Sequence, residues 1–592
     1  MKLFHGALIL CLAGAARADS PEAAFARVDQ SNVPAEEARG RIATVVQALT
    51  DAGMPRSATV LLAALAADAQ QPEGVREAAK AALAARAADD PGLAELLLAQ
   101  ESDPGRLPAA LAVRLARGHL ERALQLAPVE EGVAFDNLKA PQGPALQQAA
   151  TTGSAAGSAA ASAPANPAAS PEAAPVVKPL DRELAAEMGQ PAQEPAAPKP
   201  QAPAPVDPQP LRSAQQELDR ARALAASVPA GDALEADARE VAGLSALAAG
   251  DDAGAAREFL ALAQLPAGKG DRAATERRDK AYLQLARLAY QGGDDARATQ
   301  LYERVGRSGP EWLEALFEAS WAHFRKTEDE KALGNLLTLH APFFQNRFFP
   351  ESFVLKALVL YQNCRYADAR ATLLDFEQRY RPLQEGLSAT LAKLGTPQSA
   401  YEFLARGAVE VQESVPPAAR EEVGRVEQEP DLLGATQAAV QLAQEIDSLD
   451  RRPAVFRSSA LITRLTPRLR QARLALLESA GHKLLSRLAQ ERSELRELLG
   501  QTLRLSYEIA GREKELAATS GDGLTSTHRD PPHVDDDEEL WPFQGEYWRD
   551  ELGSYRYQLG KRCAKPRAAP QTASSPPDPK HLKAQLAADP KE

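Results

Sequence analysis

Apolar residues recur along most of the chain at intervals of three and four positions, which is the period of a helix with one buried face. Two such stretches, 39–52 and 57–67, are separated by a Gly-Met-Pro turn, and a third covers 107–126 with a break at Gly118. Only 5% of the residues are aromatic, whereas alanine and leucine are abundant, a composition that favours helices over sheets. The pattern predicts an all-α protein whose N-terminal region, 19–135, consists of short paired helices in degenerate repeats.

The centre of the chain repeats itself at a spacing near 34 residues. The clearest unit combines large, small, turn-forming and helix-ending residues: Tyr282, Leu285, Ala286, Gly293, Ala298, Tyr302 and Pro310. Three further units have small or aromatic residues at matching offsets: Gly243, Ala255, Phe259, Ala332, Ala357, Tyr366 and Ala369. Because proline lacks the N–H that a continuing helix needs, Pro310 and Pro382 are predicted to end the second helix of their units.

These offsets resemble the tetratricopeptide (TPR) family, in which each repeat is a helix-turn-helix pair. Two antiparallel helices approach closely only where both carry small residues, here Ala286 and Ala298. One pair cannot bury its own apolar face, so three or more must stack. The resemblance implies a TPR superhelix over 213–385, with a concave groove that takes an extended or helical peptide from a partner protein.

Two regions flank these repeats. Fifteen of the 44 prolines fall at 141–210, and no aromatic residue occurs from 136 to 258, so a disordered linker is predicted over 136–212. Downstream, 386–520 is predicted to form long helices, and the periodic segment 469–516 carries leucine and isoleucine at gaps of three, four or seven positions. Such a stripe suits either a helical hairpin folded on itself or onto the repeats, or a coiled coil interrupted at Glu491, Thr502 and Arg512.

The first eighteen residues have the features of a secretory signal: Lys2, a short apolar run at 7–13, and small residues before Asp19. The apolar run is shorter than the roughly 20 residues that span a bilayer, and no later segment is long and apolar enough. Leu10 precedes Cys11 where a lipoprotein signal has a small residue. We therefore expect export to the periplasm of a Gram-negative bacterium, without lipidation and without a transmembrane segment.

Removal of this signal leaves two cysteines, Cys364 and Cys563, in an oxidising compartment. We predict that they form a disulfide; the alternative is a pair of unrelated buried thiols. Cys563 ends a region, 521–563, that begins as an acidic loop and then concentrates aromatic residues, and the tail 564–592 is predicted to be disordered.

The aromatic residues of that region are Trp541, Phe543, Tyr547 and Trp548. Two interpretations stay open for them. They could form a partner-binding patch, since interface anchors favour Trp and Tyr. Alternatively, the segment could dock onto the chain's own superhelix and cap its open end, because terminal repeats must be covered. A bridge between Cys364 and Cys563 would favour docking.

Residues that carry chemistry are scarce. The formal net charge of −13 disfavours nucleic-acid binding, which needs clustered Lys and Arg. The chain has no phosphate-binding glycine loop and none of the common hydrolase or metalloprotease motifs. His528 and His533 precede an acidic run from Asp535, a pattern more typical of a solvated loop than of a metal site. We expect a protein that is not an enzyme and has no cofactor and no metal.

The expected function is a periplasmic TPR scaffold for protein–protein interaction in an envelope complex. The Cys364-Arg365-Tyr366 unit and the run 546–553 are similar to myxobacterial envelope TPR proteins, some of them linked to gliding motility. That resemblance implies protein partners and peripheral association with the envelope. The alternative is a structural, self-assembling helical protein: the coiled-coil segment would drive assembly, and the N-terminal region would tether one envelope layer to another across the linker.

Overall fold

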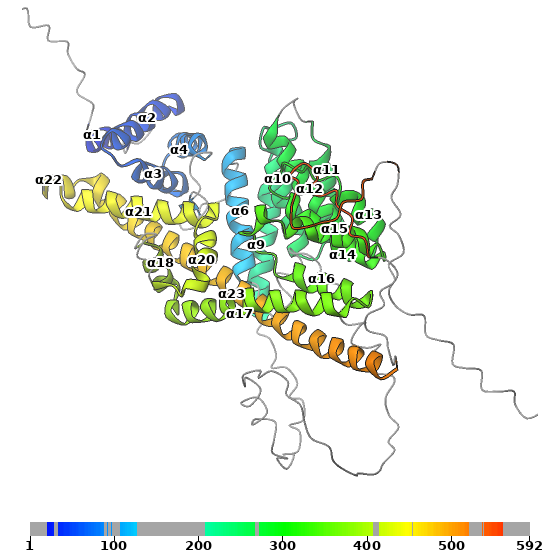
Figure 1. Ribbon diagram of the computed structural model, residues 1–592. Helices are drawn as coiled ribbons and strands as arrows, with labels where there is room; N and C mark the ends of the chain where they lie inside the picture. Colours follow the sequence, from blue (N-terminus) through cyan, green and yellow to red (C-terminus); the bar gives the residue numbers. More distant parts are fainter. Residues whose placement is uncertain are drawn as a thin grey trace, which may run out of the picture.

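The computed structural model describes residues 20–28, 34–87, 92, 96–97, 107–126, 208–266, 271–405, 414–452, 454–519, 536 and 538–559. Every regular element in these residues is a helix and none is a strand, which confirms the predicted all-α fold class. The N-terminal helices lie at one end, the paired helices of the centre at the other, and the long helix α23 (Ala460–Thr519) runs between them (Figure 1). The predicted signal segment and most of the predicted linker lie outside the described residues.

Four helix pairs follow one another through the centre of the chain. They are α10 (Glu235–Ala248) with α11 (Asp252–Gln264), α12 (Arg272–Gln291) with α13 (Asp295–Tyr302), α14 (Trp312–Arg325) with α15 (Asp329–Leu339), and α16 (Glu351–Gln362) with α17 (Tyr366–Leu394). The helices of each pair are in contact, and each pair contacts the next. A single 3-10 turn, η1 (Pro342–Phe344), lies between α15 and α16. The region predicted to repeat is therefore a series of stacked helix pairs.

The turn inside each pair has the same backbone geometry. Its left-handed residues are Gly250, Gly293, Thr327 and Cys364, with φ between +56° and +80°. The residue after each of them donates its N–H to the carbonyl five positions earlier, at 2.8–2.9 Å. This bond closes the first helix in the manner of a Schellman motif and starts the second one at once. Glycine adopts this conformation without strain, whereas Thr327 and Cys364 adopt it against a steric penalty.

Small residues sit where the paired helices cross. The alanine near the start of each second helix is wholly buried: Ala255, Ala298, Ala332 and Ala369 are all 0% exposed. Ala286 and Ala357 in the first helices are equally buried. A Cβ on Gly243 would lie 2.7 Å from the Phe259 ring, so a glycine is needed there for the ring to pack. The small residues of the repeat pattern are thus buried in the pairs, and Gly243 meets Phe259 within the first pair.

The helix α23 joins the two large hydrophobic cores of the molecule. It contacts α17, α18 (Pro397–Ala405), α20 (Arg420–Glu427), α21 (Pro430–Asp450) and α22 (Ala454–Arg457). Its stripe from Leu465 to Leu498 is buried in the first core, whereas Leu505 and Ile509 are buried with the helix pairs. Gly481 lies so close to the carbonyl of Pro397 that a Cβ would overlap it. The predicted stripe is therefore covered by the chain's own helices, as in the hairpin interpretation.

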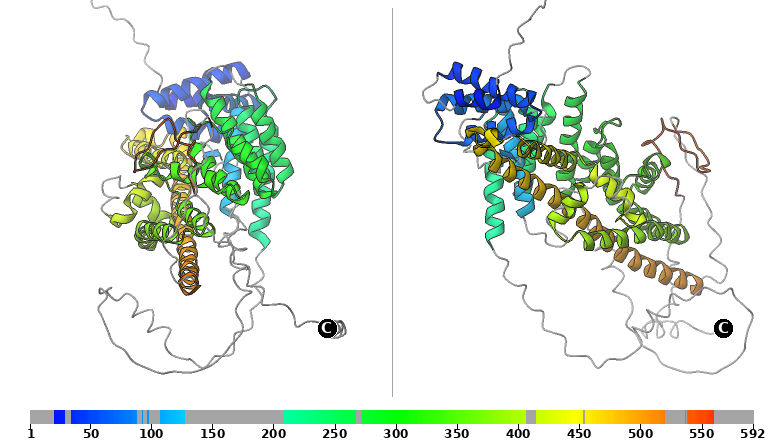
Figure 2. Two further views of the ribbon diagram at one scale, coloured as in Figure 1. Left: turned by 45° about the vertical axis from the view of Figure 1, so that its right-hand side comes forward. Right: turned by 90° about the vertical axis from the view of Figure 1, so that its left-hand side faces the viewer.

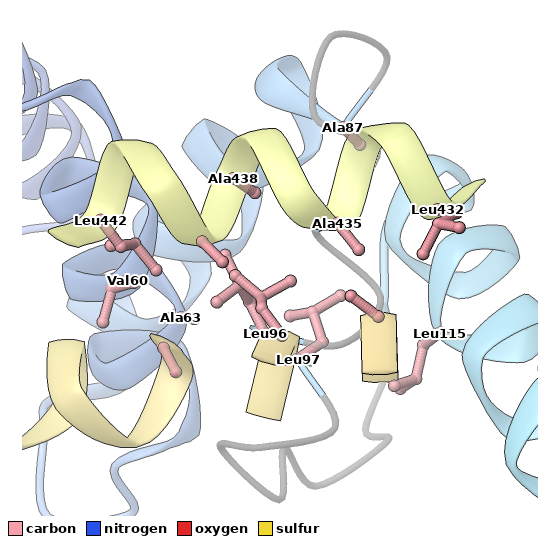
Figure 3. Packing of buried hydrophobic residues seen from close by; sticks show 14 of the residues in the cluster. Val60, Ala63, Ala87, Leu96, Leu97, Leu115, Leu432, Ala435, Ala438 and Leu442 are labelled. Carbon is pink, nitrogen blue, oxygen red and sulfur yellow. The ribbon is translucent and has the colours of Figure 1, made fainter. Parts of the chain in front are cut away.

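The N-terminal helices pack against this C-terminal part. They are α1 (Pro21–Val28), α2 (Ala35–Asp51), α3 (Pro55–Ala67) and α4 (Glu73–Arg86). Figure 3 shows Ala435, Ala438 and Leu442 of α21 facing Val60 and Ala63 of α3 and the pair Leu96–Leu97. One continuous core therefore includes residues more than 350 positions apart in the chain.

A buried carboxylate fixes this contact. The Glu445 oxygens of α21 accept the N–H groups of Arg56 and Ser57 at 2.9 and 2.6 Å and the Ser57 hydroxyl at 2.7 Å. Helix α3 begins at Pro55 and has no side-chain cap of its own, so its free N–H groups would otherwise be unsatisfied. Glu445 thus caps a helix from a distant part of the sequence, and its charge suits the positive end of the helix dipole.

Helices on either side of the predicted linker pack side by side. They are α6 (Ala109–Leu126) and α9 (Pro208–Ala226), which form one of the most extensive contacts in the described residues (Figure 2). His119 Nδ1 of α6 lies 2.5 Å from Glu217 Oε2 of α9, and both side chains are buried. The helices on either side of 127–207 therefore belong to the same bundle, which does not favour the idea that this stretch separates two distant modules.

Three predicted boundaries are wrong. Pro382 does not end a helix but lies inside α17, which therefore crosses the predicted domain boundary at 385. The loss of one backbone hydrogen bond is offset because Leu387 and Leu394, beyond the proline, are buried in the core shared with α23. Gly118 lies within the continuous helix α6 and is buried. The predicted linker also extends too far, since α9 begins at Pro208.

The packing predicts that cutting the chain between α6 and α9 will not separate its parts. A specific protease site inserted near residue 160 should yield two fragments that co-elute in size-exclusion chromatography at neutral pH and separate only in denaturant. A cleaved protein carrying Leu115→Asp, which places a charge in the core beside α6, is the control and should dissociate. Separation of the unsubstituted fragments in native buffer would contradict the packing.

A partly buried ionic cluster, with Glu491 of α23 fully buried, connects α20 and the start of α21 to α23. Arg425 contacts Glu422 at 2.5 Å, Glu429 at 3.2 Å and Glu491, and Arg487 lies 3.1 Å from Glu429 and 3.3 Å from Glu491. Three carboxylates thus face two guanidinium groups. Burial, followed by the neighbouring Glu422, raises the pKa of Glu491 to about 8 despite both arginines. A proton on Glu491 balances the charges and can be shared with Glu422.

The stability of the protein should consequently fall as the pH rises towards 8. The native state keeps the Glu491 proton up to about pH 8, whereas the unfolded chain releases it near pH 4.3. Between these values this group lowers the free energy of unfolding by as much as about 1.4 kcal/mol per pH unit. Glu491→Gln should make the free energy of unfolding less dependent on pH, and the control Glu497→Gln, on the exposed side of α23, should leave that dependence unchanged. Urea unfolding at pH 5.5, 7 and 8.5 measures both. If the free energy of unfolding changed equally with pH in the wild type and both variants, the raised pKa would not belong to Glu491.

Candidate interaction surface

The C-terminal segment 538–559 has no regular secondary structure and lies against the third helix pair (Figure 1). Two glycines allow the close approach. A Cβ on Gly334 of α15 would overlap the carbonyl of Tyr555 and lie 3.1 Å from Arg556 Cα. A Cβ on Gly553, whose φ is +85°, would lie 2.8 Å from the Trp312 ring. The backbone of the segment therefore rests directly on α14 and α15.

Hydrogen bonds to helix α15 hold the end of the segment. The Tyr557 N–H donates to the Glu330 carbonyl and the Leu559 N–H donates to Glu330 Oε1, both at 3.0 Å. The Gly553 N–H donates to the Thr338 hydroxyl at 2.9 Å. Leu552 and Leu559 are 6% and 4% exposed, so apolar burial adds to these polar contacts. The attachment is to an interior pair of the series, not to the open end that the capping interpretation expects.

The predicted aromatic residues form a cluster of their own on this base. The Trp541 and Trp548 ring centroids are 4.5 Å apart with planes inclined by 32°, and Phe543 meets Tyr547 edge to face at 5.1 Å. The Tyr555 hydroxyl accepts the Trp548 N–H at 3.0 Å and lies 3.2 Å from the Trp548 carbonyl. The rings are thus held in place by one another and by the docked part of the segment.

Much of this cluster faces solvent. Phe543 is 46% exposed, Trp548 is 51% exposed, and Leu540 beside them is 51% exposed. Phe343 of η1 is 52% exposed and lies under the Arg549 guanidinium, 5.8 Å from its ring centroid. We call Trp541, Phe543, Tyr547, Trp548 and Phe343 the aromatic surface. Sequence reasoning found the first four through their local concentration but not Phe343, which lies nearly 200 positions away.

The segment that carries most of the aromatic surface has an excess of negative charge. Residues 538–559 include two arginines and five carboxylates, the carboxylates being Glu538, Glu539, Glu546, Asp550 and Glu551. Glu538 pairs with Arg556 at 2.8 Å, and Glu546 accepts from Trp541 Nε1 at 3.1 Å and from the Gln544 N–H at 2.9 Å. Burial raises the pKa of the Tyr547 hydroxyl, so this tyrosine stays neutral.

The helix pairs themselves bury their large side chains. Tyr290 and Trp321 are each 1% exposed, in the same core as Leu505 and Ile509 of α23. Arg287 of α12 donates to both oxygens of the fully buried Glu318 at 3.0 and 3.1 Å, and burial raises the pKa of that glutamate. The large side chains of these helix pairs are therefore buried, in contrast to the exposed rings of the aromatic surface.

The turn that carries Cys364 lies beside this attachment. Asn363 donates to Asp329 at 2.7 Å, next to the Glu330 that binds the segment. Cys364 takes part in a disulfide. Cys563 lies outside the described residues, so its pairing with Cys364 stays a prediction.

A histidine and a serine meet where α15 ends and α16 begins. His340 Nε2 lies 2.8 Å from the Ser352 hydroxyl, but Ser352 is fully buried and donates to the Phe349 carbonyl at 2.5 Å. Burial, with Lys356 and Arg379 nearby, lowers the pKa of His340 to about 3. The described residues contain no group of three or more His, Cys, Asp or Glu side chains placed to hold a metal ion. His528, His533 and Asp535 lie outside them.

Comparison with protein-family models and with curated proteins finds no match to this chain. Among the helices of the described residues, none has the length and apolar character needed to cross a membrane.

Gly334 provides a direct test of the docked segment. In a helix, Gly→Ala normally stabilises by roughly 0.5–1 kcal/mol, but at Gly334 the new methyl group would collide with the backbone at Tyr555. Gly334→Ala should therefore increase hydrogen exchange at residues 553–559 and lower the free energy of unfolding. Gly500→Ala in α23, where nothing lies within 4 Å of a Cβ, is the matched control and should have the opposite effect on stability. Unchanged exchange at 553–559 would contradict the docking.

Proposed function

We propose that this protein is a non-catalytic adaptor: an exported, periplasmic scaffold of the TPR type that binds a protein partner through its aromatic surface. The observation that carries the proposal is the exposure of Phe543 and Trp548 on a segment fixed to the helix pairs, together with that of Phe343 on η1. Monomers seldom expose contiguous large apolar side chains without a binding role. Trp and Tyr also supply much of the binding energy at protein interfaces.

The support beneath the aromatic surface favours binding over simple packing. The rings stack on one another, and backbone hydrogen bonds tie the segment to α15, so few rotamers remain to be fixed when a partner arrives. A preordered surface loses less conformational entropy on association than a mobile one. The helix pairs act as the frame that holds this surface at a defined place.

The structural alternative receives less support. Self-assembly through the leucine stripe of α23 would require that stripe to be free, yet Leu484, Leu488 and Leu495 are 0% exposed against the chain's own helices. A tether across the linker would require its ends to be far apart, whereas α6 and α9 pack together. We therefore give the adaptor role precedence.

The proposal predicts a contact at the aromatic surface in the cell that produces the protein. A photoreactive benzoylphenylalanine at position 543 should give a specific cross-linked product with a partner protein. The same probe at position 507, where Tyr507 is 71% exposed on α23, should not. Trp548→Ala, with wild-type thermal stability, should reduce the 543 product at least tenfold, as expected for an interface residue that supplies about 2 kcal/mol. A product that is unchanged by Trp548→Ala, or equal at both positions, would refute the proposal.

A further inference from the structure

The chemistry around the aromatic surface indicates what kind of partner it fits. We propose that it binds a cationic, extended segment of the partner protein, through lysine or arginine side chains that lie on the exposed rings. This inference rests on the proposed function and deepens it. It starts from three observations: the exposed rings, the exposed carboxylates of the same segment, and an arginine that already lies over one ring of the surface.

Part of the hydrogen-bonding capacity of the aromatic segment is used within the segment itself. The indole N–H of Trp541 donates to Glu546, and the Tyr555 hydroxyl bonds to the backbone of Trp548. The exposed rings then present their electron-rich faces to a partner. Such faces attract ammonium and guanidinium groups, by about 0.5–1 kcal/mol at an exposed site and more when water is excluded.

The molecule itself shows this contact. The Arg549 guanidinium lies over the Phe343 ring, 5.8 Å from the ring centroid, at the edge of the aromatic surface. Phe343 remains 52% exposed and Trp548 51% exposed, so further cations can reach the surface. The contact demonstrates that the local geometry admits a guanidinium on an aromatic face.

The negative charge of the segment favours a positively charged ligand. Glu539, Asp550 and Glu551 lie in the same segment as the rings and are exposed. Residues 538–559 have five carboxylates and two arginines, and one of those arginines, Arg556, is paired with Glu538. An acidic ligand would be repelled, whereas a basic ligand gains both from the carboxylates and from the rings.

The ligand is expected to be extended. The surface is carried by an irregular segment whose backbone lies on α14 and α15. An extended chain places alternate side chains on one side, which allows successive lysine or arginine stems to cover neighbouring rings. Apolar stems and charged ends then match the rings and the carboxylates respectively.

Fluorescence anisotropy with defined peptides tests this assignment. The probes are a labelled 14-residue peptide of Ala, Pro and six Arg, and the same peptide with Glu in place of Arg, added to the mature full-length protein. The Arg peptide should bind and the Glu peptide should not. Trp548→Ala should weaken binding at least tenfold, whereas Tyr507→Ala should leave it unchanged.

Charge-matched variants separate a local effect from the overall acidity of the protein. Glu539→Gln/Asp550→Asn/Glu551→Gln should weaken binding severalfold and reduce its dependence on salt between 50 and 200 mM. Glu73→Gln/Asp252→Asn/Glu508→Gln removes the same charge from exposed positions on α4, α11 and α23 and should have little effect. Equal losses in both triple variants would overturn the assignment, as would binding of the Glu peptide.

Two further outcomes are decisive. If the Arg peptide binds only after residues 564–592 are deleted, the surface is occupied by the chain's own tail and the assignment to a partner is wrong. If no peptide binds but the position-543 probe still captures a partner in a Trp548-dependent manner, the proposed function stands and the cationic ligand is wrong. If no peptide binds and the position-543 probe captures no partner in a Trp548-dependent manner, both proposals are wrong.

Discussion

The burial of one continuous apolar stripe along α23 is the constraint on which the remaining structure depends. This helix extends over 60 residues, and its leucines face α17, α18 and α21 before they reach the helix pairs. A fully buried leucine contributes roughly 1.5–3 kcal/mol relative to an exposed one, so a stripe of this length outweighs several local penalties. Burial of this stripe explains why α17 continues through Pro382. It also explains why a glycine, Gly481, lies where Pro397 approaches α23.

Repetition and long-range packing make different contributions to this architecture. The turns within the helix pairs are local: a left-handed residue and a backbone bond to the carbonyl five positions earlier define each of them. The placement of the pairs is not local. Glu445 caps α3 from α21, and His119 meets Glu217 between α6 and α9. Such polar contacts are specific because a buried carboxylate without its partners is costly, and they therefore determine which helices meet.

Sequence reasoning succeeded where the signal is local and failed where it depends on distant partners. The alanines at 298 and 332 and the glycines at 243 and 293 could be identified because pair geometry restricts residue size and backbone angle there. Thr327 and Cys364 adopt the same left-handed turn without being glycine, so composition alone did not reveal them. The four aromatic residues of the C-terminal segment were found as a local excess. Phe343 and Gly334 were not, because their roles arise only when the segment lies on α15; a glycine inside a helix was the one available hint.

The pairing of α6 with α9 has a consequence for how this protein can change over evolution. Because these helices hold the ends of 127–207 together, that stretch is an insertion between neighbouring elements and not a spacer between modules. The entropic cost of closing a loop between two fixed ends grows only with the logarithm of its length, so doubling the length costs about 0.6 kcal/mol. Descendants of this sequence can therefore lengthen, shorten or replace the stretch with little effect on the helical core. Sequence drift should be fastest there and slowest at the two helices that flank it.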